Sequence, residues 1–414
     1  MAAPAHRCWP GPSGWPSGSW VGPGSGSLAL RGYFRHPGGN GLASGVIRVL
    51  HIARYRSLSM ERKLEIMATR SELVLWLVRP AFWEDEYGKV VVNPVVPGCQ
   101  VRRVPLVGKI NDPHRALYRT LTFGLLSIRP HIIHAEEEPD SLAALQIALA
   151  RRLFAPQAKL ILHTWQNVNR PKRWYVRLVT RIALREADAI LCANSEGVQV
   201  LREMGYSGPT AVIPPVGVDT RVFRPVERKP SGAFVVAYAG RFVPEKGLDT
   251  LMEAVARLDP EVELWLIGNG PYRPALEALS QQLGIEERVR WVEPVPPERM
   301  PELLALVDVV VLPSRTTRVW KEQFGRILVE AMACKVPVVG SDSGAIPEVV
   351  GDAGLIFPEG DAAALAECLN QLKQSPELYT QLAERGLTRA QLYDQKYIAS
   401  LTADYYNQIA RSFW

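Results

Sequence analysis

The sequence lacks the features that mark membrane, secreted and metal-binding proteins. No apolar run reaches the roughly 18–20 residues that a helix needs to cross a bilayer. The five cysteines are scattered and form no C-x-x-C pair, so we expect neither a disulfide framework nor a zinc site. There is also no D-x-D pair to hold Mg²⁺ or Mn²⁺. These absences predict a protein of the reducing cytoplasm that uses no bound metal.

Acidic residues are absent from positions 1–45, which are rich in glycine, proline and serine. The segment has no apolar periodicity and no continuous apolar run of a secretory signal. We expect it to be a disordered tail or a mis-assigned start, with the natural start near Val46. Without it the net charge falls from +6 to +3. That value is too close to neutral to suggest a nucleic-acid partner.

From Val46 onward, short apolar segments alternate with amphipathic segments of helical period. Strand-like segments of the first half lie at 46–53, 72–78, 131–135, 159–164, 189–194 and 210–218. After a break rich in proline and charge at 224–232, they lie at 234–240, 263–268, 289–293, 307–314 and 336–342. Short apolar strands that alternate with helices are typical of parallel sheets covered on both faces. The pattern therefore predicts two doubly wound α/β domains in series.

The predicted organisation has four parts along the chain. These are the segment 1–45, a first Rossmann-like domain at 46–225, a second at 226–390 and a C-terminal helix at 391–414. In doubly wound sheets, ligands bind beyond the carboxyl ends of the strands. We therefore expect a ligand site in a cleft where the two domains face each other.

The first motif of the second domain is AGRFVPEKGLDT. A predicted strand ends at Gly240, and Arg241 and Lys246 follow before a helix begins near Gly247. Two cations beside a helix N-terminus suit a diphosphate, because the free N–H groups add partial positive charge. The alternative is a solvated basic loop. The nearby WLIGNGP places Gly268 and Gly270 between a strand and a helix, where they favour close backbone approach or simply a tight turn.

The second motif is KEQFGRILVEAM, in which Glu322 and Glu330 stand on either side of a predicted helix start at Gly325. The first turn of that helix can receive a phosphate. Glu330, roughly 1.5 turns further on, can then accept the hydroxyl groups of a ribose. The alternative is a pair of surface glutamates on an amphipathic helix. The apolar neighbours of Glu330 argue against that alternative.

These motifs, with GSDSGAIPEVV and GLIFPEGD in the same order, resemble the family-4 retaining glycosyltransferases of the GT-B fold. The resemblance covers nearly all of 46–390. It implies two Rossmann-like domains across a cleft, with the C-terminal helix packing back on the first domain. It also implies diphosphate binding at Arg241 and Lys246, donor-sugar contact at Glu322 and ribose contact at Glu330. Further donor contacts are implied for the segment of Phe324, Gly325, Ile327 and Leu328.

The resemblance extends to the first domain with less specific motifs. ILHTWQN is similar to the strand that ends in a cleft-facing histidine, here His163, which could instead be a hydrogen-bonded structural histidine. HIIHAEEEPDSLA is similar to the segment that shapes the acceptor side, here Glu137 and Glu138. The glycine-rich loop of many members is replaced by residues that we take as acceptor-side candidates, Arg54, Tyr55, Arg56 and Ser57. This replacement favours a charged or phosphorylated acceptor.

The reaction implied by the resemblance moves a hexose from a nucleotide-diphosphate sugar to a saccharide or lipid-linked acceptor, with retention of configuration. Arg241, Lys246 and helix amides would stabilise the leaving diphosphate without a metal or a cofactor. Two alternatives on the same fold stay open. One is another enzyme class, a sugar-nucleotide epimerase or a phosphorylase-like enzyme. The other is a catalytically silent protein that binds a nucleotide sugar.

A basic stretch at 169–189 combines cations with two aromatic residues, Trp174 and Tyr175. The cations are Arg170, Lys172, Arg173, Arg177, Arg181 and Arg185. A basic helix with interfacial aromatic residues can rest on anionic lipid, here at the inner face of the membrane. The alternative is a solvated helix face laced with salt bridges.

Overall fold

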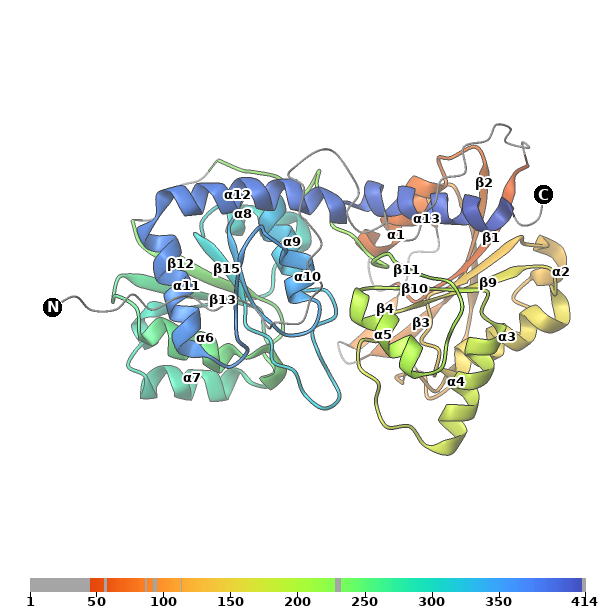
Figure 1. Ribbon diagram of the computed structural model, residues 1–414, viewed down its shortest axis with the longest axis horizontal. Helices are drawn as coiled ribbons and strands as arrows, with labels where there is room; N and C mark the ends of the chain where they lie inside the picture. The colour runs from red at the N-terminus through yellow and green to blue at the C-terminus, as the bar shows by residue number, and fades with distance from the viewer. Residues whose placement is uncertain are drawn as a thin grey trace, which may run out of the picture. The chain divides into compact units, whose positions relative to one another are not determined.

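The computed structural model describes residues 45–55, 58–85, 88–91, 95–112, 114–227 and 232–411. The expected tail at 1–45, apart from its last residue, lies outside these ranges, as do Arg56, Ser57 and part of the predicted linker. The described chain contains two large parallel sheets, each covered by helices (Figure 1). This is the two-domain α/β architecture that the alternation of segments predicts.

The first sheet has seven strands in the order β11-β10-β9-β8-β1-β2-β5, all of them parallel. Their bounds are β1 (Ile47–Ile52), β2 (Leu73–Pro80), β5 (Cys99–Val104), β8 (Ile132–Ala135), β9 (Lys159–Thr164), β10 (Ala189–Cys192) and β11 (Thr210–Val212). Two antiparallel hairpins accompany the sheet: β3 (Phe82–Asp85) with β4 (Gly88–Val91), and β6 (Leu106–Gly108) with β7 (Ala116–Tyr118). All residues of β8 and β10 are buried, as expected for inner strands of a doubly covered sheet.

Helices cover both faces of this sheet. Their bounds are α1 (Leu58–Met67), α2 (Leu125–Ile128), α3 (Leu142–Phe154), α4 (Trp174–Glu186) and α5 (Ser195–Glu203). Alternate residues of β1 enter different cores: Leu50 packs with the side chains of α3 and α4, whereas Val49 packs with those of α1. Side chains cap the starts of α3 and α5: Ser141 Oγ accepts from the N–H of Ala144 at 3.0 Å, and Asn194 Oδ1 accepts from the N–H of Gly197 at 3.0 Å.

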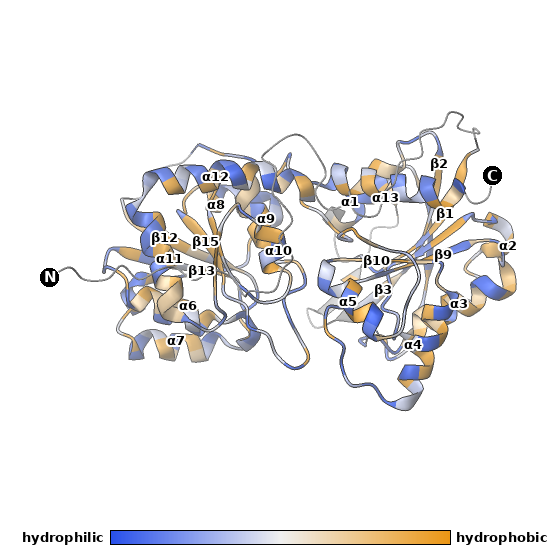
Figure 2. Ribbon diagram, in the orientation of Figure 1, coloured by the Kyte–Doolittle hydropathy of each residue, from blue (hydrophilic) through white to orange (hydrophobic). Residues whose placement is uncertain are grey.

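The second sheet has six parallel strands in the order β14-β13-β12-β15-β16-β17. Their bounds are β12 (Phe234–Ala239), β13 (Val262–Ile267), β14 (Val289–Val292), β15 (Val309–Leu312), β16 (Val338–Ser341) and β17 (Leu355–Phe357). The helices are α6 (Leu248–Ala256), α7 (Arg273–Gln282), α8 (Met300–Leu304), α9 (Arg326–Ala333), α10 (Ile346–Val350), α11 (Ala362–Gln374) and α12 (Pro376–Ala390). Figure 2 shows hydrophobic colour on the strands and mixed colour on the helices that cover them.

The C-terminal helix α13 (Gln395–Ala410) packs against the first domain rather than the second. Its buried residues Ile398 and Tyr406 belong to the same apolar cluster as Val49 and Leu64. The Tyr406 hydroxyl also lies 2.5 Å from Nδ1 of His134 in β8. The predicted return of this helix to the first domain is therefore confirmed. Among the described residues, none of the helices combines the length and the apolar character needed to cross a bilayer.

Candidate functional site

The strand ends of the second sheet bring a lysine and a glutamate together. Lys246 ends a short 3₁₀ turn after β12, and Glu322 lies in the loop between β15 and α9. The Nζ atom of Lys246 donates to Oε2 of Glu322 at 2.6 Å, and Ser314 Oγ donates to the same oxygen at 2.9 Å. Glu322 is only 7% exposed. The indole ring of Trp320 covers the ammonium group, with 4.8 Å between Nζ and the ring centroid.

The glycines of the loops after β12 and β13 are needed by the backbone itself. A Cβ atom on Gly268, whose φ is +140°, would lie 2.0 Å from the carbonyl oxygen of Gly240. One on Gly270 would lie 2.3 Å from the carbonyl oxygen of Phe242. These contacts account for Gly268 and Gly270 through the tight packing of two loops, which was the alternative interpretation of the motif. Their predicted role in donor binding stays a prediction.

Helix α9 begins directly after Gly325, whose φ of +74° favours glycine. Gly325 is the N-cap residue and has no side chain with which to cap this start. The N–H groups of Arg326 and Ile327 have no acceptor within the helix, because the first turn never provides one. The N–H of Leu328 differs, since it donates to the carbonyl oxygen of Gly325 at 2.9 Å. Of the predicted backbone contacts, that of Leu328 is therefore already engaged.

Glu330 lies one turn into α9 and pairs with a residue of its own helix. Its Oε1 atom is 2.8 Å from Nε of Arg326, and its side chain is 12% exposed. Burial raises the pKa of Glu330, and the neighbouring Arg326 opposes that rise. Glu330 is therefore not surface decoration, in agreement with the sequence interpretation. Arg241 is half-buried at the end of β12, where the Tyr238 hydroxyl donates to its carbonyl oxygen at 2.8 Å.

A cavity of ≈ 210 Å³ lies beside the start of α9. Residues of both predicted domains line it: Met60, Trp165, Val216, Glu322, Gln323, Phe324, Gly325 and Arg326. The candidate donor residues Glu322, Phe324 and Gly325 thus share one cavity wall. The first domain contributes Met60 of α1 together with Trp165 and Val216, which follow β9 and β11, as expected for a ligand site between two doubly wound domains.

His163 does not face this cavity, so the expectation of a cleft-facing histidine is wrong. The residue is 1% exposed. Its Nε2 atom lies 2.7 Å from the carbonyl oxygen of Ile213, and its Nδ1 atom lies 3.1 Å from Nε2 of His134. Burial lowers the pKa of His163 to about 3. A neutral histidine with both nitrogens engaged has a structural role, which was the alternative that the sequence left open.

His163 belongs to a buried polar cluster with His134 and Glu136, whose potential metal-ligand atoms lie within 4.8 Å of one another. Glu136 Oε1 already accepts from Lys63 Nζ at 2.6 Å and from Tyr55 OH at 2.7 Å. A metal ion at this carboxylate would meet the Lys63 ammonium, which repels it. The cluster fits a hydrogen-bond network better than a metal site.

Two of the acceptor-side candidates, Arg54 and Glu137, contact each other in the first domain. Arg54 donates to Glu137 through Nε at 3.0 Å and through Nη2 at 3.1 Å, and Tyr118 OH donates to Glu137 at 3.0 Å. Tyr55 donates to Glu136, as described above. Burial raises the pKa of Glu137 above its usual value, and the neighbouring Arg54 only partly offsets this rise. These charged groups hold one another in place through hydrogen bonds. Their role toward an acceptor stays a prediction.

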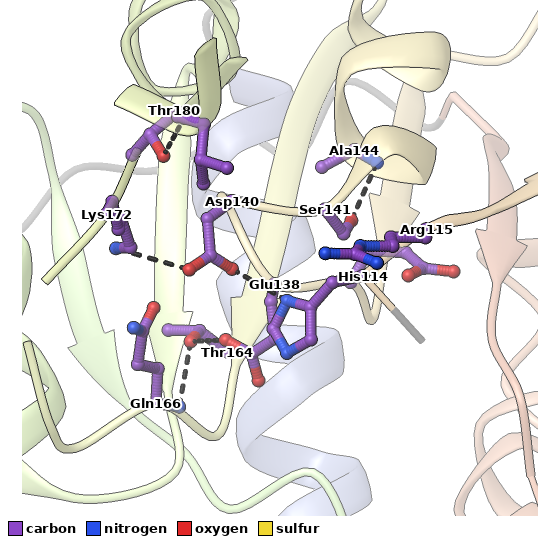
Figure 3. Close-up of polar contacts among 12 residues, drawn as sticks. His114, Arg115, Glu138, Asp140, Ser141, Ala144, Thr164, Gln166, Lys172 and Thr180 are labelled. Atoms are coloured by element: carbon purple, nitrogen blue, oxygen red, sulfur yellow. Dashed lines mark hydrogen bonds and ion pairs between the residues drawn. The ribbon is translucent and has the colours of Figure 1, made fainter. Parts of the chain in front are cut away.

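Glu138 begins a second polar cluster at the ends of β8 and β9 (Figure 3). It accepts from the N–H of Trp165 at 2.9 Å and from the Thr164 hydroxyl. Nearby, Nδ1 of His114 lies 3.0 Å from Asp140, which also pairs with Lys172 at 3.2 Å. Hydrogen bonding to Asp140 raises the pKa of His114. Burial would raise the pKa of Asp140, but His114 and Lys172 outweigh burial and hold it at about 2.

The basic segment at 169–189 includes α4, which exposes apolar and cationic side chains together. Trp174 is 77% exposed and Leu178 is 51% exposed. No carboxylate of the described chain forms an ion pair with the arginines of this segment, which are Arg170, Arg173, Arg177, Arg181 and Arg185. Lys172 is the exception, through Asp140. The alternative of a face laced with salt bridges is therefore wrong for these arginines.

Comparisons with known proteins agree with this arrangement. A family model described as "Glycosyl transferases group 1" matches residues 219–389, and "Glycosyl transferase 4-like domain" matches 67–216. The lipopolysaccharide core biosynthesis glycosyltransferase LpsE of Rhizobium meliloti is 33% identical over 303 residues, which cover 70% of this chain and 82% of that protein. The MMP alpha-(1->4)-mannosyltransferase of Mycolicibacterium hassiacum is 33% identical over 261 residues, or 60% of this chain and 61% of that protein.

A solved structure supports the fold. HepE of Anabaena in complex with UDP has a TM-score of 0.65 at 20% identity, and the match covers 88% of this chain and 100% of that one. The two Rossmann-like domains thus have the GT-B arrangement. The chain belongs to the group 1 glycosyltransferases, family 4 of the GT-B fold.

Proposed function

We propose that this protein is a retaining glycosyltransferase that moves a hexose from a nucleotide-diphosphate sugar to a saccharide or lipid-linked acceptor. The observation that carries the proposal is the pairing of Lys246 with Glu322, which itself lines the cavity beside the start of α9. Cation, carboxylate and free helix amides are the groups that a diphosphate sugar requires. The family membership supports the same reaction.

The catalytic effect that we propose is electrostatic. Negative charge develops on the diphosphate as it leaves, and Lys246, Arg241 and the first amides of α9 stabilise it. Glu322 contacts the hydroxyl groups of the sugar, and Glu330 those of the ribose. Charge-assisted hydrogen bonds of this kind contribute about 1.5–3 kcal/mol each. These groups supply the stabilisation without a metal, so full activity in excess EDTA is the expected result.

The acceptor that we propose follows from the relatives and from the first domain. The names of the relatives describe lipopolysaccharide core synthesis and mannosyl transfer, which supports a saccharide or lipid-linked acceptor. The exposed Trp174 favours peripheral contact with anionic lipid, as do the arginines of α4, which form no ion pair with a carboxylate of the described residues. We therefore propose a cytoplasmic enzyme that works at the inner face of a membrane.

The experiment that tests the donor assignment is a thermal-shift panel of UDP-, GDP- and ADP-sugars without metal. Stabilisation by one nucleotide class in the wild-type protein, lost in Glu330→Ala, is the expected result. Product analysis then separates the rival enzymes, because an epimerase releases an altered nucleotide sugar in the absence of any acceptor. No stabilisation by any donor in a folded protein would contradict the proposal, and binding without turnover would favour the catalytically silent alternative.

A further inference from the structure

Amide side chains of the first domain hold the loop that carries Glu322. The Nδ2 atom of Asn167 donates to the carbonyl oxygen of Glu322 at 2.9 Å, and Nδ2 of Asn194 donates to the carbonyl oxygen of Gln323 at 2.8 Å. In the other direction, Gln323 Nε2 donates to the carbonyl oxygen of Trp165 at 3.0 Å. The backbone of this donor-side loop is therefore tied to segments that follow β9 and β10.

The carbonyl oxygen of Glu322 is fixed from two sides. Besides Asn167, the N–H of Ala345 donates to it at 2.9 Å. Gly344 packs so closely that a Cβ atom there would lie 2.2 Å from the same oxygen. The peptide of Glu322 is thus clamped between a turn of its own domain and an amide of the other. A fixed peptide also fixes the direction in which the side chain of Glu322 projects from the backbone.

Asn167 is itself held in place. It is 4% exposed, and its Nδ2 atom lies 3.2 Å from Oε2 of Glu196. The other oxygen of Glu196 accepts from Nζ of Lys321 at 2.9 Å. Asn167 is therefore linked through Glu196 to Lys321, which is the residue directly before Glu322. An amide held this firmly offers its hydrogen in one direction at little further cost in side-chain entropy.

From these contacts we infer that Asn167 is a positioning residue for Glu322, so that recognition of the donor sugar depends on an amide of the acceptor-side domain. This inference rests on the proposed function. Asn167 bonds the main chain of Glu322, and the carboxylate of Glu322 contacts the sugar. Arg241 and Lys246 contact the diphosphate. Loss of the Asn167 amide should therefore weaken binding of the sugar part and spare binding of the diphosphate.

The test measures the affinity of the protein for UDP, GDP, ADP, UDP-glucose, GDP-mannose and ADP-glucose by calorimetry. For the nucleotide that binds, we expect Asn167→Ala to weaken the nucleotide sugar about five- to tenfold, as for one buried hydrogen bond, and the free diphosphate less than about twofold. Asn169→Ala is the matched control, because that exposed amide bonds Glu203 of its own domain. The control should leave both affinities unchanged.

Asn167→Asp provides a second variant of nearly identical shape. Its carboxylate would face the Glu322 carbonyl and Glu196, so it should lose at least as much sugar affinity as the alanine variant. If only one variant folds, that variant decides the outcome. A double-mutant cycle with Glu322→Gln should show strong non-additivity, since Asn167 acts through Glu322.

The outcomes separate this inference from the proposed function. Equal weakening of diphosphate and nucleotide sugar, unchanged affinity of both Asn167 variants, or an additive cycle would overturn the positioning role while the donor assignment stands. Failure of the wild-type protein to bind any of the six probes would overturn the proposed function and the inference together.

Discussion

The Nζ atom of Lys246 and the Oε2 atom of Glu322 lie 2.6 Å apart, so the two charged groups that we assign to the diphosphate and the sugar neutralise each other. A diphosphate that binds Lys246 must compete with this carboxylate for the ammonium group. The ring of Trp320 lies over the same ammonium group and covers one side of it. Donor binding is therefore an exchange of ion-pair partners rather than the capture of an uncompensated charge.

Replacement of Lys246 by alanine tests this assignment. We expect Lys246→Ala to lower kcat more than about tenfold, because one charge-assisted contact to the leaving diphosphate is lost. Steady-state kinetics with the donor identified by the thermal-shift panel measure the effect. Lys373→Ala is the control, since it removes only an exposed ion pair with Asp259. A folded Lys246→Ala protein with near-native kcat would contradict the role of Lys246.

Replacement of Glu330 tests the ribose contact. We expect Glu330→Ala to lower turnover more than about tenfold and to abolish the preference for the ribonucleotide over its 2′-deoxy analogue, because the acceptor of the ribose hydroxyls is gone. Competition between the two nucleotides measures the preference. Glu384→Ala, which removes an exposed partner of Lys335, should keep it. A variant that still prefers ribose would place the ribose contact elsewhere.

Much of the fold was predictable because the inner strands are buried on both faces. Such strands are continuous apolar runs, and the pattern shows them directly. Strand β5 was not predicted, because it lies at the sheet edge and its sequence CQVRRV exposes Gln100, Arg102 and Arg103. Edge strands with outward charges lack the apolar run on which the prediction depends. The hairpins β3-β4 and β6-β7 were not predicted either, because strands of three or four residues are too short to show a period.

Residues of the candidate site could be predicted only where they belong to a motif whose order along the chain indicates which residues come together. The motifs indicated that Lys246 and Glu322 belong to one site, although they lie 76 residues apart. The prediction of a cleft-facing His163 was wrong because a histidine at a strand end has the same sequence context whether its ring enters a cleft or a core. The distant partners His134 and Ile213 decide between the two. The pairing of His114 with Asp140 was not predicted, because His114 belongs to no motif and Asp140 lies in HIIHAEEEPDSLA without a partner that the sequence could indicate.

The His114–Asp140 pair predicts a pH-dependent contribution to stability. Because the pKa of His114 is raised in the folded state, its contribution is complete below the unfolded value of 6.5 and is lost as pH rises through the folded value. Asp140, with a pKa of about 2, stays ionised throughout this range. We expect His114→Ala to lower Tm about 1–2 °C more at about pH 5.5 than at about pH 9.

His131 provides a control of opposite sign for this experiment. Burial lowers the pKa of His131, and Arg48 lowers it further. The folded state therefore favours neutral His131, and the residue costs stability as pH falls below its unfolded pKa. Differential scanning calorimetry of His131→Ala should show a relative gain in Tm at the acidic pH. A loss for His114→Ala that is equal at both pH values would mean that the ion pair does not hold in solution.

The exposed face of α4 predicts salt-sensitive binding to anionic vesicles. We expect the protein to float with vesicles that contain anionic lipid at about 0.1 M salt and to dissociate near about 1 M, where the Debye length falls to about 3 Å. The double variant Arg181→Glu and Arg185→Glu should lose binding, and Trp174→Ala should weaken it at every salt concentration at which the wild-type protein binds. Leu392→Ala, which removes an exposed apolar side chain outside α4, should bind normally. Absence of the wild-type protein from the floating fraction at low salt would reject the membrane contact while leaving the donor assignment intact.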